Sequence, residues 1–345
     1  MKQRLAGEQP ADSLPAALRV AYRPLDGLEP LPAGVLAAIR FGVPQVGFPR
    51  GAEPASDTPL SIDVGLDPLQ GPPLAELWFA NGPVRTGRFG QGGIVRYAHD
   101  DHYLFAVVEL DERVHGGILS TAEYAYAAMR EFQQQSAFPH LLRMWNYLDA
   151  INEGEGDLER YRQFCVGRGR GLGLGPATHG YPSATAIGRQ RADHHLQVFW
   201  LAGKAAGTAV ENPRQVSAYH YPRVHGPVSP SFSRALVAPD RTVLISGTAS
   251  IVGHVSQHHG DAMEQLEETV RNLTAFNAHT SRRHTTDSKD LLKVYVRDPA
   301  LTAPVAARLR QLYPDSDILL VAADVCRREL LVEIEAVVGA WEAAA

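Results

Sequence analysis

The sequence predicts an α/β (α+β) protein made of two similar halves, each a mixed sheet with helices packed on one face. The first observation is length, because 345 residues suit two domains of roughly 150 residues each. The second is a repeat, because the predicted order hairpin, helix, strand, helix, strand occurs twice, although the two copies share little residue identity. The predicted helix starts at Ser120 and Asp261 lie 141 residues apart. We therefore predict a first half over 84–205 and a second half over 206–345.

The N-terminal segment 1–83 is rich in Pro, Gly and Ala and has only short apolar stretches. Val43–Phe48 and Leu74–Phe79 are typical of brief strands joined by turns. We expect this segment to pack on the core that the two halves form.

The first half opens with a predicted hairpin around the polar turn 99–102. Its strands are Ile94–Ala98 and Tyr103–Leu110. Ser120–Glu123 then has the spelling of a capping box, and an apolar stripe at helical spacing follows it, formed by Ala125, Ala128, Met129 and Phe132. The remaining predicted elements are a strand over 141–148, a short helix over 157–165, a Gly-rich loop over 167–175 and a strand over 196–201.

The Gly-rich stretch GRGRGLGLG, residues 167–175, does not fit a dinucleotide-binding loop. That fingerprint requires a strand before the glycines and a helix after them, whereas here a helix precedes them and none follows. We interpret the stretch as a mobile loop or a loop that approaches an anion, in which Arg168 and Arg170 are the side chains that could contact the anion.

The second half repeats the same order of elements. A hairpin is predicted around residues 238–241, and Asp261–Glu264 repeats the capping-box spacing ahead of an apolar stripe formed by Met263, Leu266, Val270 and Leu273. A strand over 291–298, a helix over 301–313, a strand over 317–324 and a last strand within 326–338 complete the half.

Composition excludes several classes of function. The net charge of −5 and the lack of a basic run argue against binding to nucleic acid or to anionic lipid. No apolar run approaches the roughly 20 residues that span a bilayer, and we predict a cytoplasmic protein. Cys165 and Cys326 are too few for a disulfide framework, and the histidines match no established metal-ligand spacing, so we predict no metal.

The last strand carries two carboxylates in an aliphatic run. Alternation places Leu331, Glu333, Glu335 and Val337 on one face of this strand. That face is either solvated or turned into a pocket. In a pocket, apolar neighbours would raise the pKa of a carboxyl group toward the range useful for a general acid.

Residues 218–237, AYHYPRVHGPVSPSFSRALV, concentrate groups that suit a small acidic ligand. A guanidinium matches a carboxylate with two parallel donors, and a phenol can pack against a ring while it donates to an oxygen. The groups in question are Tyr219, Tyr221, Arg223, Ser229, Ser231 and Arg234. An ordinary polar loop between the halves is the alternative interpretation.

Four stretches in order make the chain resemble the chorismatases, whose halves are similar to the YjgF/RidA fold. They are RMWNYLDAINEGEGDLERYRQFCVGR (143–168), SPSFSRALV (229–237), LISGTASIVGH (244–254) and CRRELLVEIEAVV (326–338). Together they are specific, and the resemblance covers about residues 90–340. It also agrees with the duplicated pattern.

The resemblance implies roles for seven residues of this sequence. Glu333, the first acid of VEIE, matches the family's catalytic acid, and four residues match positions that hold chorismate, namely Tyr161, Arg168, Tyr221 and Arg234. Cys326 and Gly247 match the positions by which the family separates its product classes, and they resemble the branch that forms hydroxybenzoate.

The implied function is the conversion of chorismate to pyruvate and 3-hydroxybenzoate, with some 4-hydroxybenzoate, and without a cofactor. The alternatives are hydrolysis of chorismate to a dihydroxycyclohexadiene carboxylate and a non-catalytic ligand-binding protein of the YjgF/RidA type. An imine deaminase is disfavoured, because its substrate-binding arginine is here Ile318. The implied partner is the small-molecule substrate, and the chain is expected to be a monomer or a YjgF-like trimer, of which we favour the monomer.

Overall fold

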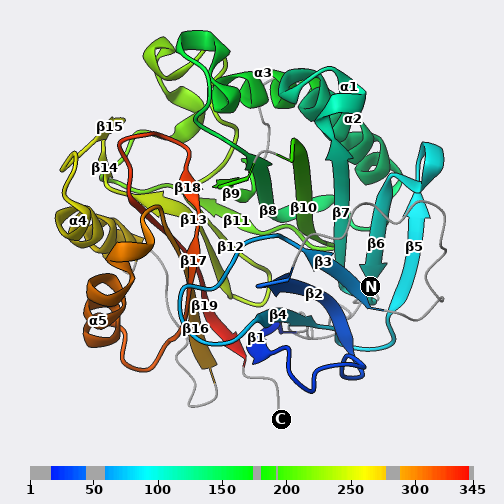
Figure 1. The fold of residues 1–345 in the computed structure, drawn as a ribbon. Coiled ribbons are helices and arrows are strands. Elements are labelled where there is room, and N and C mark those ends of the chain that lie inside the picture. The colour runs from blue at the N-terminus through cyan, green and yellow to red at the C-terminus, as the bar shows by residue number, and fades with distance from the viewer. Residues whose placement is uncertain (1–16, 44–58, 174–179, 192, 277–287, 342–345) are drawn as a thin grey trace, which may run out of the picture.

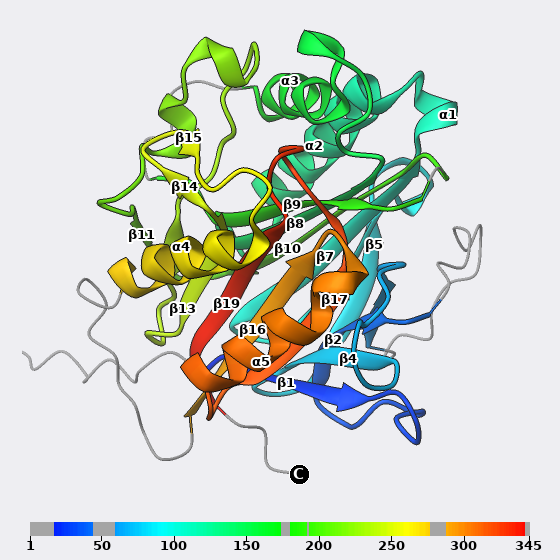
Figure 2. The same cartoon turned by 60° about the vertical axis from the view of Figure 1, so that its left-hand side comes forward.

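The computed structural model describes residues 17–43, 59–173, 180–191, 193–276 and 288–341. Its strands form two large sheets, and the helices lie outside them (Figures 1 and 2). Helices α2 and α3 lie against one sheet, and α4 and α5 lie against the other. No helix of the described residues is long and apolar enough to cross a membrane.

The first sheet contains seven strands within the described ranges. Their order is β18-β9-β8-β10-β7-β6-β5. Helices α2 (Ile118–Gln135) and α3 (Arg160–Leu172) bury their apolar faces on its outer side. The strands are β5 (Arg85–Phe89), β6 (Val95–His99), β7 (Tyr103–Asp111), β8 (His140–Asp149), β9 (Ser183–Arg189), β10 (His195–Gly203) and β18 (Asp324–Val325).

The second sheet contains ten strands within the described ranges, and helices α4 (Ala262–Ala275) and α5 (Thr302–Leu312) cover its outer face. The strands are β1 (Arg19–Pro24), β2 (Val35–Phe41), β3 (Leu60–Asp63), β4 (Leu74–Phe79), β11 (Thr208–Val210), β12 (Ala235–Val237), β13 (Val243–Ala249), β16 (Ser288–Val296), β17 (Asp317–Ala322) and β19 (Val332–Trp341). Outside the two large sheets and the four longer helices lie the short helix α1 (Glu112–His115), the hairpin of β14 (Ile251–Val252) and β15 (Val255–Ser256), and several short 3-10 helices.

The predicted duplication is confirmed by strand pairing. In the first half β8 runs parallel to β9 and antiparallel to β10, and in the second half β16 runs parallel to β17 and antiparallel to β19. The two halves contact each other through these strands, where the hydroxyl groups of Tyr147 on β8 and Tyr295 on β16 are hydrogen-bonded at 2.8 Å. The main core lies between the two sheets, where the rings of Trp78, Phe105, Trp145 and Phe199 pack together.

The N-terminal segment contributes strands β1–β4 to the ten-stranded sheet, and β1 lies beside the last strand, β19. The predicted strand Leu74–Phe79 is confirmed as β4, whereas 44–48 of the predicted strand Val43–Phe48 lie outside the described residues. The division into 1–83, 84–205 and 206–345 stays a prediction.

The Gly-rich loop predicted over 167–175 is wrong through Leu172, because helix α3 continues that far and ends at Gly173 in the left-handed region. Gly167 and Gly171 face α2, where a Cβ would overlap the carbonyl oxygens of Leu119 and Glu123. These glycines therefore permit close packing of two helices rather than a mobile turn. Residues 174 and 175 lie outside the described residues.

One predicted helix start is confirmed and the other is wrong. Asp261 caps α4, because its carboxylate accepts hydrogen bonds from the backbone N–H groups of Met263 and Glu264. The box at Ser120–Glu123 is not a cap, because α2 already begins at Ile118 and the Thr121 hydroxyl donates to the Gly117 carbonyl inside the helix.

Candidate active site

A cavity of about 410 Å³ opens between the two halves of the chain. Helix α3 of the first half supplies one wall, and strands β13 and β19 of the second half supply another. Six of the seven residues that the resemblance singles out line this cavity, namely Tyr161, Tyr221, Arg234, Gly247, Cys326 and Glu333. Residues far apart in the sequence therefore converge on one hollow, as a binding site requires.

Arg168 is the seventh residue, and it does not line this cavity. It is buried in α3, where its guanidinium lies over the ring of Tyr126 and donates to the backbone carbonyl of Ser231. Ser231 lies between Pro230 and Phe232, which do line the cavity. The structure thus places Arg168 behind the wall, because the stretch that contains it is helical and not a loop.

Glu333 lies at the start of β19 with only 4% of its surface exposed. Its carboxyl group lines the cavity and forms no hydrogen bond or ion pair with any other described residue. Burial, reinforced by the negative charge of Glu335, raises the pKa of Glu333 to about 8, although Arg143 and Arg234 act in the opposite direction. This carboxyl group is therefore protonated at neutral pH and can donate a proton into the cavity.

Gly247 makes room for this carboxyl group. It lies in β13 at an irregularity of the ladder with β19, between Ile245 and Thr248. A Cβ at this position would overlap the carboxyl group of Glu333, so any larger residue would displace the acid. The backbone N–H of Gly247 donates to the hydroxyl of Thr185 across the sheet interface.

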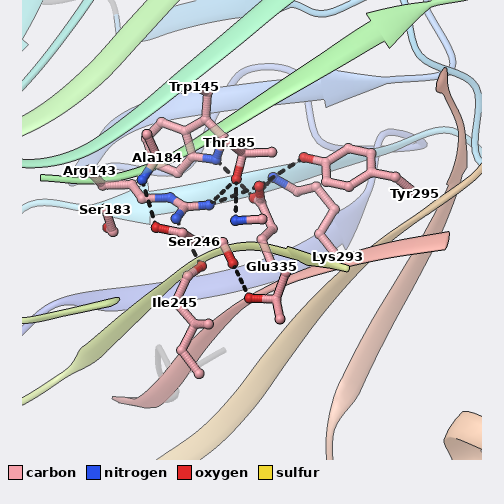
Figure 3. Close-up of polar contacts among 12 residues, drawn as sticks. Arg143, Trp145, Ser183, Ala184, Thr185, Ile245, Ser246, Lys293, Tyr295 and Glu335 are labelled. Carbon is pink, nitrogen blue, oxygen red and sulfur yellow. Dashed lines mark hydrogen bonds and ion pairs between the residues drawn. The ribbon is translucent and has the colours of Figure 1, made fainter. Parts of the chain in front are cut away.

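The second carboxylate of the strand, Glu335, has a contrasting environment (Figure 3). Its two oxygens accept from Trp145 Nε1 at 2.8 Å, from Lys293 Nζ at 2.9 Å and from Tyr295 Oη at 3.0 Å, and they pair with Arg143 Nη2 at 2.8 Å. Burial alone would raise its pKa, but the charges of Lys293 and Arg143 outweigh it and lower the pKa of Glu335 to about 2.

The solvated-face interpretation of the last strand is therefore wrong, because both carboxylates are buried between the two sheets. Lys293 also binds Glu76 of strand β4, with Nζ 2.7 Å from Oε2, and Trp78 Nε1 donates to the other oxygen of Glu76 at 2.8 Å. The N-terminal segment thus reaches the charged cluster beneath the cavity. Sequence reasoning did not identify Glu76, Lys293 or Arg143.

Cys326 follows the short strand β18 and lines the same cavity as Glu333. Burial and the negative charge of Glu333 raise the pKa of the Cys326 thiol. It is therefore an uncharged thiol at neutral pH and not a thiolate nucleophile. Tyr161, at the start of α3, is likewise a neutral phenol, because burial raises its pKa well above the usual range.

The opposite side of the cavity carries positive charge and aromatic rings. Arg234 Nη2 donates to the hydroxyl of Tyr221 at 2.6 Å and to the Val216 carbonyl at 2.9 Å. Arg327 and His225, which sequence reasoning also missed, line this side. His225 Nε2 lies 3.0 Å from Nδ1 of His254, but no described group of three or more His, Cys, Asp or Glu side chains is arranged to hold a metal ion.

Known protein families and solved structures contain proteins similar to this chain. The sequence pattern of the family described as "Chorismatase FkbO/Hyg5-like, N-terminal" matches residues 76–202. A YjgF-family protein from Neisseria meningitidis also matches, at 18% identity and a TM-score of 0.28, over 34% of this chain and 92% of that chain.

Longer matches are to chorismatases. A "3-hydroxybenzoate synthase" from Streptomyces hygroscopicus is 34% identical over 77% of this chain and 82% of its own length. A "Chorismatase" from the same organism is 37% identical over 77% of this chain and 79% of its own length. The crystal structure of a chorismatase superposes with a TM-score of 0.78 at 30% identity, covering 94% of this chain and 99% of that chain. The chain belongs to the chorismatase family.

Proposed function

We propose that this protein is a chorismatase that converts chorismate to pyruvate and 3-hydroxybenzoate, with some 4-hydroxybenzoate. The observation that carries the proposal is a buried carboxyl group, Glu333, whose pKa is raised to about 8 and which lines a cavity together with the guanidinium of Arg234. A protonated acid beside a cation suits a substrate that carries carboxylates and must accept a proton on carbon.

Glu333 delivers its proton to the methylene carbon of the enolpyruvyl group, which becomes a methyl group. The ether carbon is left as an oxocarbenium-like cation. Capture of this cation by the neighbouring ring hydroxyl, or by water, leads to cleavage of the ring ether and release of pyruvate. In the hydroxybenzoate route, loss of a ring proton then restores the acid, whereas in hydrolysis the captured water supplies that proton. The hydroxybenzoate route consumes no water overall, whereas hydrolysis to the dihydroxycyclohexadiene carboxylate consumes one molecule.

Cys326 and Gly247 support the hydroxybenzoate route over hydrolysis. Gly247 leaves the space in which Glu333 lies, and Cys326 places an uncharged, weakly polar thiol in the same cavity. We propose that this thiol steers the ring intermediate toward aromatisation. Replacement of Cys326 by Ala then shifts the products toward the diene, and an unchanged product ratio would remove Cys326 from the mechanism.

The experiment that tests the function is incubation of the purified protein with chorismate, followed by assays for pyruvate and hydroxybenzoate. Equal amounts of pyruvate and hydroxybenzoate are expected. Binding of chorismate without turnover would support the non-catalytic alternative and overturn the proposal. The imine-deaminase alternative gains nothing from the structure, because Ile318 packs against the apolar cluster beneath α4 and α5.

The cavity takes its walls from both halves of one chain, which supports a monomeric enzyme. We propose a monomer that works in the cytoplasm on a free small molecule. Analytical ultracentrifugation at assay concentrations tests the first statement, and a trimer would contradict it.

A further inference from the structure

Two arginines from separate segments, Arg234 and Arg327, place their guanidinium groups over the ring of Tyr221. The central carbon of Arg234 lies 5.4 Å from the ring centroid, and that of Arg327 lies 5.3 Å from it. Both arginines line the cavity that contains Glu333. Neither forms an ion pair with a carboxylate of the described residues, so this side of the cavity holds two cations without an ion-pair partner.

The other arginines of the cavity wall are engaged differently. Arg162 Nε binds the carboxylate of Glu159 at 3.1 Å, and Arg328 donates to the backbone carbonyl of Asn152 at 2.5 Å. Arg327 uses only Nη1, which donates at 3.0 Å to the His254 carbonyl and at 3.0 Å to Ser256 Oγ. Its remaining N–H groups form no hydrogen bond with a described residue, which leaves donors for a ligand.

Arg327 has a neutral imidazole and one acidic side chain as its titratable neighbours on this side of the cavity. Burial, helped by the positive charge of Arg327, lowers the pKa of His225 to about 4, so the imidazole is neutral at pH 7. The neighbouring acid Glu329 accepts a hydrogen bond from Ser256 Oγ at 2.7 Å and does not come within ion-pair distance of Arg327. The guanidinium of Arg327 is therefore hydrogen-bonded to neutral groups, with the Glu329 carboxylate near it but beyond ion-pair distance, and it keeps donors for a ligand.

We propose that Arg327 binds the ring carboxylate of chorismate while Arg234 binds the carboxylate of the enolpyruvyl group. This assignment rests on the proposed function, because it requires a substrate with two carboxylates. The pair around Tyr221 then forms a receptor for a dicarboxylate, and Tyr221 fixes the separation of the two cations.

The position of Glu333 decides which arginine binds which carboxylate. The methylene carbon that accepts the proton lies one bond from the carbon that bears the enolpyruvyl carboxylate, so that carboxylate must lie near Glu333. The charge of Arg234 acts on Glu333, whereas the charge of Arg327 acts on Cys326 and His225. Arg327 is thus on the side where Cys326 is proposed to act on the ring.

The test measures equilibrium binding of two probes, 3-hydroxybenzoate and pyruvate, by calorimetry. Each probe carries only one of the two carboxylates. Arg327→Ala is expected to weaken binding of 3-hydroxybenzoate about tenfold or more, as loss of a charge-assisted contact does. The affinity of the same variant for pyruvate should stay within about twofold of the wild-type value. Arg234→Ala is expected to give the opposite pattern. Arg170→Ala, on the exposed side of α3, serves as the control and changes neither affinity.

Two further variants separate binding from folding. Arg327→Lys keeps the charge and should recover part of the affinity for 3-hydroxybenzoate, and Ser256→Ala removes one hydrogen bond of Arg327 without removing its charge. A loss for 3-hydroxybenzoate that is as large in Ser256→Ala as in Arg327→Ala would overturn the proposal. So would an equal loss for both probes, or no loss, in Arg327→Ala. If the wild-type protein binds both probes but releases no pyruvate from chorismate, the proposed function fails independently.

Discussion

Glu333 and Glu335 lie two residues apart on the same face of one strand, yet they are in opposite protonation states. Both are almost completely buried, with 4% and 5% of their surfaces exposed. Glu335 is surrounded by donors and cations, and its pKa falls to about 2. Glu333 has no such partner, and its pKa rises to about 8. Partners therefore decide the charge of a buried carboxyl group, and burial alone does not.

The cluster beneath the cavity is balanced only while Glu333 is neutral. It contains two carboxylates, Glu76 and Glu335, and two cations, Lys293 and Arg143. Ionisation of Glu333 would add a third negative charge beside a cluster that is already neutral and buried, which is costly. Burial thus keeps Glu333 protonated, and the negative charge of Glu335 in the paired site reinforces it.

The largest expected effect comes from removal of the unpaired acid. Glu333→Gln should lower kcat by about 10²–10⁴-fold, the typical contribution of general acid catalysis. The amide keeps the shape of the side chain and cannot ionise, so the variant should fold and be at least as stable to thermal unfolding as the wild type at pH 7. Activity within tenfold of the wild type would exclude Glu333 as the acid.

Removal of a cation from the paired site should act on stability instead. Lys293→Met leaves Glu76 and Glu335 without their shared partner in the core, and such a loss typically costs about 3–5 kcal/mol in the free energy of unfolding. Urea unfolding measures this change. Lys289→Met on the same strand is the matched control, because Lys289 is 40% exposed and its pair with Asp317 should contribute at most about 1 kcal/mol. Equal changes in the two variants would contradict the role of the cluster.

The two carboxylates should give opposite pH dependences of stability. The folded pKa of Glu333 is raised, so its contribution is complete below the unfolded value of about 4.3 and is lost as pH rises through about 8. The folded pKa of Glu335 is lowered, so its contribution is lost as pH falls from about 4.3 to about 2. Each group changes the free energy of unfolding by at most about 1.4 kcal/mol per pH unit. In Glu333→Gln the loss of stability as pH rises toward 8 should disappear, whereas the loss of stability at acid pH should remain. If the stability of the variant still falls toward pH 8, a group other than Glu333 is responsible.

The smallest expected effect comes from the N-terminal segment. In the wild type kcat/KM should fall above pH 8 as Glu333 ionises. Glu76→Gln removes one negative charge from the cluster and leaves it with a net positive charge. That charge should lower the pKa of Glu333, so that kcat/KM begins to fall at a lower pH than in the wild type. Glu29→Gln is the control, because Glu29 lies in the same segment and pairs with Arg40 at the surface. If kcat/KM of Glu76→Gln falls at the same pH as in the wild type, Glu76 does not act on Glu333.

The sequence predicted the order of elements because hydrophobic period and turn signals are local. The alternation of the last strand correctly placed Glu333 and Glu335 on one face, but it left open whether water or protein covers that face. The cover is the other sheet, whose strand β8 is far away in the sequence, so no local pattern could decide. A signal was nevertheless present, since Lys293 and Arg143 interrupt apolar strands in the same way as the two acids.

Glycines were interpreted less successfully than charges. The glycines at 167 and 171 suggested a loop, because glycine in a helix is unfavourable in isolation. In the structure they lie against the backbone of α2, and tertiary packing outweighs the local preference. That difference moved Arg168 from the cavity to its supporting wall, and it left Arg327, beside Cys326, as an unassigned cation of the site.

The protonation state of Glu333 is the central claim, and infrared difference spectroscopy of the wild type against Glu333→Gln measures it most directly. We expect a protonated carboxyl band at pH 7 that is absent from the variant and disappears with a midpoint near pH 8. A spectrum in which this group is already a carboxylate at pH 6.5 would contradict the claim and the proposed mechanism with it.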